Sequence, residues 1–164
     1  MPARVLLLDS PTAPLADLAS AFASAAEPGT RVERVGTPAA LLDLLVGDRA
    51  RCVVVVAREG TGAEDPVALI PRLRATAPEV PVVVAARSGD VHAAAHAIAA
   101  GATDFLVLAP PLEPRVVTLL GKLRGLLEAL DRNRRLDDLN VQLRTTLQAR
   151  FHLVGTSAEM RILL

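Results

Sequence analysis

The sequence predicts an α/β fold: a doubly wound, five-stranded parallel sheet followed by a long C-terminal helix. Four of its five short Val- and Leu-rich runs are continuously apolar, which is typical of strands covered on both faces. Segments with helical periodicity separate these runs, and such βα repeats build a sheet between two helical layers with right-handed crossovers. In sheets of this kind the functional site lies where the strands end.

Hydrophobic patterns, capping residues and prolines predict the bounds of the individual strands and helices. Strands are expected over 4–8, 31–35, 52–57, 80–86 and 104–108. The second run, RVERV, alternates between apolar and charged residues, which indicates an edge strand. Helices are expected over 14–27, 38–47, 65–78 and 90–102. Thr37 is a predicted N-cap before Pro38, and Asp65 and Asp90 cap two further helices. Pro71 lies inside the third helical pattern, so that helix is expected to bend or to start late.

Composition excludes several classes of function. The formal charge is balanced at 18 basic and 18 acidic residues, so no global field favours nucleic acid or an anionic membrane. Cationic charge is almost entirely arginine, because Lys122 is the only lysine. Cys52 is the only cysteine and is interpreted as a small buried hydrophobe. No signal peptide or membrane-spanning run is present, so we expect the chain to be cytoplasmic and to have no membrane partner. No cofactor is expected either.

The last third of the chain, residues 112–150, has the pattern of one long helix. Its first apolar seam is either core-facing or a coiled-coil surface, and it contains Val116, Leu120, Leu123, Leu127 and Leu130. A second seam, out of phase with the first, contains Leu136, Leu139, Leu143 and Leu147. Such a helix is too long for a domain of this size to cover, so we expect it to dimerise with its own copy. A partly helical, solvated linker is the alternative.

The strand ends offer little reactive chemistry. The first strand leads into Asp9 and Ser10, the third ends at Ala57, the fourth at Ala86 and the fifth at Leu108. Ala57, in the middle of the predicted sheet, carries only a methyl group.

Two of these segments resemble the receiver domains of bacterial response regulators. RVLLLDS is similar to the first strand of that family, and VPVVVAARSGDVHAAAHAIAAGATDFLVLAP is similar to its fourth and fifth strands, with the GA-x-D-F-L signature. The resemblance covers residues 3 to 125 and implies a receiver-like domain over 1–125 with strand order 2-1-3-4-5. Residues 112–150 then form the extended fifth helix and linker.

The resemblance also implies a site that this chain has lost. Asp9 matches the first metal-binding acid of a receiver, but Ser10 stands at the second acid. Ala57 stands at the phosphoacceptor aspartate, Ala86 at the hydroxyl position and Leu108 at the lysine, while Phe105 matches the switch aromatic.

The chemistry of these replacements agrees with a loss of activity. Acyl phosphate formation needs a carboxylate nucleophile, and it also needs metal and lysine charge to neutralise the phosphoryl group. A methyl group supplies no nucleophile, and one carboxylate is too few for Mg²⁺. We therefore expect no metal, no enzyme activity and no phosphorylation. Two residues remain as weaker alternatives: Glu59 could mimic a permanent charge, and Asp65 could be a relocated phosphoacceptor.

The C-terminal segment FHLVGTSAEMRILL, residues 151–164, resembles the opening of the AAA+ domain in NtrC-type sigma-54-dependent activators. This resemblance implies a fragment of a longer activator, with an AAA+ domain and sigma-54 RNA polymerase as partners.

The leading functional hypothesis is therefore a phosphorylation-independent regulatory domain that controls dimerisation, through the 112–150 helix and the neighbouring fourth and fifth helical regions. Direct nucleic-acid contact is not expected. A small-molecule or nucleotide sensor that uses the emptied pocket, and a conventional receiver with a relocated acceptor, are the alternatives. His92 and His96 have the spacing of a metal-binding pair but are interpreted as surface residues.

Overall fold

The computed structural model describes residues 2–8, 16–47, 52–58, 65–87 and 91–162. Five parallel strands form one sheet in the order β2-β1-β3-β4-β5. Their bounds are β1 (Arg4–Leu8), β2 (Arg31–Val35), β3 (Cys52–Arg58), β4 (Val82–Ala86) and β5 (Asp104–Val107). The predicted fold class and strand order are confirmed, and β2 is an edge strand as its alternating pattern indicates.

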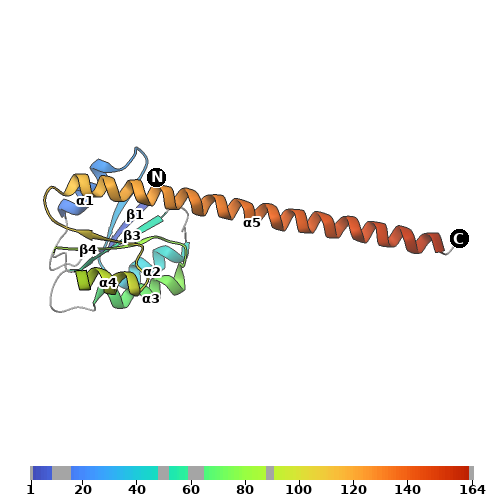
Figure 1. Ribbon diagram of the computed structural model, residues 1–164, viewed down its shortest axis with the longest axis horizontal. Coiled ribbons are helices and arrows are strands. Elements are labelled where there is room, and N and C mark those ends of the chain that lie inside the picture. The colour runs from blue at the N-terminus through green and yellow to red at the C-terminus, as the bar shows by residue number, and fades with distance from the viewer. Residues whose placement is uncertain (1, 9–15, 48–51, 59–64, 88–90, 163–164) are drawn as a thin grey trace. The chain divides into compact units, whose positions relative to one another are not determined.

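Helices cover both faces of this sheet. They are α1 (Ala16–Ala25), α2 (Pro38–Gly47), α3 (Pro66–Thr76), α4 (Val91–Ala99) and α5 (Leu112–Ile162). In Figure 1, α1 and the first part of α5 lie on one face of the sheet, while α2, α3 and α4 lie on the other. No helix within the described ranges is both long and apolar enough to cross a membrane.

The core has two halves because successive strand side chains point to opposite faces. Leu6, Val54 and Val84 pack with α2, α3 and α4 on one face. Val5, Leu7 and Val55 pack with α1 and α5 on the other. The strands are apolar on both sides because each side is covered, which is the property that made them recognisable as parallel strands.

Local signals set the helix starts. Thr37 Oγ1 accepts a hydrogen bond from the Ala40 N–H at 3.2 Å, and Asp65 Oδ1 accepts one from the Val67 N–H at 3.1 Å. The predicted caps Thr37 and Asp65 are confirmed, and the third predicted cap, Asp90, lies outside the described residues. Helix α3 begins at Pro66 and contains Pro71, so it does not start late, and the alternative expectation of a bend at Pro71 stays a prediction. Pro66 is suited to that position because the first N–H groups of a helix have no partner within the helix.

Arg74 joins three segments at the edge where β4 begins. Its guanidinium donates hydrogen bonds to the carbonyl oxygens of Gly101 (2.8 Å), Pro78 (3.0 Å) and Val80 (2.7 Å), and to Thr103 Oγ1 (3.0 Å). Partial burial lowers the pKa of Arg74, yet an arginine keeps its charge at neutral pH. Gly101 has a φ of +108°, which favours glycine and turns its carbonyl into this network.

Helix α5 belongs to two compact units of the chain, Met1–Leu127 and Glu128–Leu164. In the first unit, four members of the first seam are buried in the core beside α1: Val116, Leu120, Leu123 and Leu127. This part of the seam is therefore core-facing, the first of the two readings that the sequence allowed. The second unit is helical through Ile162.

Replacing Arg74 should destabilise the fold, because four oxygen atoms would lose a charged donor. We expect Arg74→Ala to lower the free energy of unfolding by about 2 kcal/mol in urea titrations. Arg72→Ala, an exposed change two residues earlier in the same helix, should alter it by less than about 0.5 kcal/mol. Equal losses in the two variants would contradict the structural role given to Arg74.

Candidate functional site

The carboxyl ends of β3, β4 and β5 meet at one edge of the sheet, as the sequence predicts for a site. The register pairs Ala57 with Ala85 and Ala86 with Val107. The Leu108 N–H donates a 2.8 Å hydrogen bond to the Ala86 carbonyl, so Leu108 directly follows β5 beside the end of β4. Positions 57, 86 and 108 therefore lie along the same edge of three neighbouring strands.

The described side chains at positions 86 and 108 of this edge are hydrocarbon. Ala86 is buried, and Leu108 is partly buried against the core beneath α1 and α5. An ammonium group is absent at position 108, and the leucine there contributes to the core instead. The backbone of Ala57 is placed within β3, whereas Asp9, Ser10 and Glu59 lie outside the described residues.

A hollow of about 260 Å³ opens at this edge. It is lined by Asp17, Leu18, Arg87, Leu108, Ala109, Pro110 and Leu112. Asp17 comes from the first turn of α1. The sequence did not single out Asp17, because nothing in the pattern indicates that the start of α1 lies over the end of β5.

The described residues contain no group of three or more His, Cys, Asp or Glu side chains that could hold a metal ion. His92 and His96 are both exposed on α4, which agrees with their interpretation as surface residues. Asp65, the alternative phosphoacceptor, uses Oδ1 to cap α3. Its carboxylate therefore has a structural role in this state of the protein.

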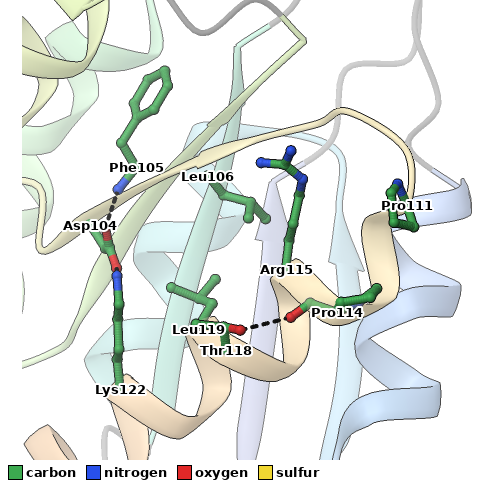
Figure 2. Close-up of a pocket in the computed structure, with 9 residues that line it drawn as sticks. All are labelled: Asp104, Phe105, Leu106, Pro111, Pro114, Arg115, Thr118, Leu119 and Lys122. Atoms are coloured by element: carbon green, nitrogen blue, oxygen red, sulfur yellow. Dashed lines mark hydrogen bonds and ion pairs between the residues drawn. The ribbon is translucent and has the colours of Figure 1, made fainter.

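A second and larger hollow, of about 410 Å³, lies between β5 and α5 (Figure 2). Its lining includes the buried leucines Leu106 and Leu119 and the two prolines Pro111 and Pro114. Phe105 also borders it, although its side chain points away from α5 in Figure 2 and packs on the core beneath α2, α3 and α4. Phe105, which the resemblance matches to the switch aromatic, is thus partly buried in this structure.

Charged side chains surround the same hollow. Lys122 Nζ lies 3.2 Å from Asp104 Oδ2, and Asp104 Oδ1 accepts a 2.8 Å hydrogen bond from the Phe105 N–H. Arg115 extends from α5 toward β5 beside Leu106 (Figure 2). No signal in the sequence indicates this cluster, because Asp104 and Lys122 are 18 residues apart along the chain and follow no motif.

The second seam of α5 lies within the unit Glu128–Leu164. Its side chains are exposed: Leu136, Leu139, Leu143 and Leu147. Leu130, the last residue of the first seam, is half-buried. Single exposed leucines are ordinary, but four at helical spacing form an apolar stripe with no partner among the described residues.

The sheet order, the two helical layers and the site at the strand ends define the class of this fold, which is that of CheY-like receiver domains. No protein-family model matches the chain, and no curated protein matches it significantly. Among solved structures, the chain is similar to NtrX from Brucella abortus, with 26% identity and a TM-score of 0.64 over 85% of this chain. It is also similar to a CheY-like response regulator receiver domain protein from Methanospirillum hungatei, with 17% identity and a TM-score of 0.59 over 81% of this chain.

The coverage of these neighbours differs. The match spans 30% of the NtrX chain but 99% of the Methanospirillum receiver domain. It also spans 99% of a BeF3-activated DrrB receiver domain, with 16% identity and a TM-score of 0.59. The shared part is therefore the receiver fold itself.

Proposed function

We propose that this chain is a phosphorylation-independent regulatory pseudo-receiver, which controls dimerisation and assembly of a sigma-54-dependent transcriptional activator. One observation carries the proposal. Positions 57, 86 and 108 lie along one edge of the sheet, and their residues are alanine, alanine and leucine.

The chemistry of phosphoryl transfer supports this proposal. A receiver of the ordinary kind needs an oxygen nucleophile at the end of β3 and positive charge to neutralise the transferred group. Ala57 has no oxygen on its side chain, and Leu108 fills the place of the ammonium with a side chain that packs on the core. Because these losses affect different requirements, restoring one group would leave the others unmet.

The apolar stripe of the second seam supports dimerisation. The first seam is buried in the core at Val116, Leu120, Leu123 and Leu127. Self-association is therefore assigned to the exposed second seam, which contains Leu136, Leu139, Leu143 and Leu147. An amphipathic helix gains most of its stability by packing that apolar face against a partner. A second copy of the chain always carries the matching stripe.

The relation to NtrX supports the assignment to an activator. The match covers most of this chain and leaves about 70% of NtrX unmatched, so the similarity concerns one part of a larger regulator. In the proposal, the partners of this chain are an AAA+ domain beyond residue 150 and, through it, sigma-54 RNA polymerase.

Treatment with a phosphodonor should leave no phosphoryl group on the chain. We expect no phosphoryl mass increment after incubation with acetyl phosphate and Mg²⁺, and no change in self-association with beryllofluoride. A receiver of known activity, treated in parallel, is the control. A phosphoryl adduct on any carboxylate would contradict the proposal and would favour a relocated acceptor.

A charge placed in the second seam should weaken the dimer. Leu143→Glu should raise the dimer dissociation constant by at least about tenfold in sedimentation equilibrium, because each chain would bury an unpaired carboxylate. Val141→Glu is the matched control, since Val141 is 64% exposed and Leu143 is 62% exposed. At about 100° per residue these two side chains leave opposite sides of the helix. Equal effects of both changes, or a monomeric parent chain, would refute the assignment.

A second function is favoured by the 260 Å³ hollow at the strand ends, which has the polar pair Asp17 and Arg87 at an otherwise apolar wall. It is a small-molecule or nucleotide sensor. A nucleotide or metabolite present at 100 times its dissociation constant should stabilise the fold by about 2.7 kcal/mol, which a thermal shift screen would detect. Ala109→Phe or Ala109→Trp, which would fill the hollow, should abolish the stabilisation seen in the thermal shift screen. A screen in which no compound stabilises the fold would exclude this function for the compounds tested.

A further inference from the structure

Lys122 differs chemically from every other cationic side chain in the protein. The chain has 18 Lys and Arg residues, of which Lys122 is the only lysine. An arginine could form the same ion pair with Asp104, but a guanidinium stays protonated and does not act as a nucleophile near neutral pH. A lysine amine, once it loses its proton, attacks acyl carbon atoms and is a common target of acetylation.

The surroundings of Lys122 hold the amine in an open and defined place. Its side chain is 65% exposed, and Nζ lies 3.2 Å from Asp104 Oδ2. The other oxygen of Asp104 is fixed by the Phe105 N–H on β5. The carboxylate therefore positions the amine beside the 410 Å³ hollow while it leaves Nζ accessible to solvent.

Arg115 adds an anion-binding group to the same hollow. It is exposed, and it makes no hydrogen bond or ion pair with any residue that the structure describes. Arg115 and Lys122 both line the hollow, with the apolar side chains of Leu106 and Leu119 between β5 and α5 (Figure 2). A free guanidinium is well suited to bind a phosphate group through paired hydrogen bonds.

We propose that Lys122 is an acylation site, at which Arg115 binds the phosphate of an acyl donor and Asp104 positions the amine. The substrates are small activated acids whose leaving group is anionic or carries phosphate. Acyl phosphates and acyl thioesters of coenzyme A share this chemistry. Lys122 would then be a covalent modification site between β5 and α5, separate from the strand-end site, where alanine stands at the position of the nucleophile.

The reaction balances without an oxidant or a metal. The Lys122 ammonium loses a proton to solvent water, and the nitrogen lone pair of the neutral amine attacks the carbonyl carbon of the donor to form a new C–N bond. The bond from that carbon to the phosphate oxygen, or to the thioester sulfur, then breaks, and phosphate or thiol leaves with the bonding electrons. The second nitrogen proton is lost, with Asp104 Oδ2 as the nearest described acceptor, and a neutral amide remains.

Acylation would change the electrostatics of this face. The charges of Arg115, Lys122 and Asp104 together give one net positive charge, and the amide would reduce it to none. Asp104 would lose its ion pair and keep its hydrogen bond to the Phe105 N–H. An exposed ion pair of this kind contributes at most about 1 kcal/mol to stability, so the fold should survive the modification.

The test is the rate of acetylation of Lys122 in the 164-residue chain, measured by intact mass and peptide mapping with acetyl phosphate and, separately, with acetyl coenzyme A. Mapping distinguishes Lys122 from the terminal α-amino group. We expect Lys122 to react faster than the side chain of Nα-acetyl-lysine amide with at least one donor. Arg115→Gln should slow that reaction about tenfold, the effect of one charge-assisted hydrogen bond. Arg132→Gln, which removes an exposed arginine from the other unit, should leave the rate unchanged.

Two results would overturn the proposal: reaction at the rate of the free amino acid derivative with both donors, or equal rates in the Arg115→Gln and Arg132→Gln variants. Reaction with only one donor would identify the source of the acyl group.

An effect on self-association rests on the proposed function and is measured separately. Sedimentation of the acetylated chain and of the unreactive Lys122→Arg variant, treated identically, shows whether acylation alters the dimer. If Lys122 is acetylated and sedimentation shows the same oligomeric state as before, the site is upheld and its link to dimerisation is contradicted.

Discussion

The burial of one parallel sheet on both faces is the constraint on which the rest of this structure depends. Val- and Leu-rich strands leave no face for water, so α2, α3 and α4 are needed on one side and α1 and α5 on the other. The first part of α5 is thereby committed to the core through residues such as Leu120 and Leu123. Only the later part of the helix retains an apolar stripe that a second chain could cover, and this separates the roles of the two seams.

The same constraint allows the fold to persist without the charged residues of receiver chemistry, as the proposed function requires. The strand ends of a doubly wound sheet are built by the topology, whichever side chains stand there. Leu108 still packs on the core, and its N–H still bonds to the Ala86 carbonyl. Receiver chemistry, by contrast, depends on a few charged groups acting together, and replacing several of them removes the reaction. Under the proposed function, fold and receiver chemistry are separable in this chain, and its role is argued from the surfaces.

The elements were predictable from the sequence because their signals are local. Continuous apolar runs, the N-caps Thr37 and Asp65 and the helical periodicity located the strands and helices to within a few residues at their ends. The exception is α5, which continues to Ile162, beyond its predicted end at residue 150. The strand-end positions followed from the resemblance, and the register places them together. The choice between core and coiled coil for the first seam was beyond the sequence, because both environments require the same 3- and 4-residue spacing. Arg74, Asp17 and the pair of Asp104 and Lys122 were missed because each acts across distant segments.

A regulatory domain changes state only if its input interacts differently with two arrangements of the molecule. At the strand ends, positions 86 and 108 carry apolar side chains, and the charged side chains that line the hollow there, Asp17 and Arg87, are of opposite sign. At the β5–α5 hollow, Asp104 bonds both to Lys122 and to the backbone of Phe105, so a change in the lysine charge reaches the aromatic residue through one carboxylate. That connection is short and is made of polar groups whose energies depend on charge. Under the proposed acylation of Lys122, we therefore expect the face formed by β5 and α5 to respond to a change of charge.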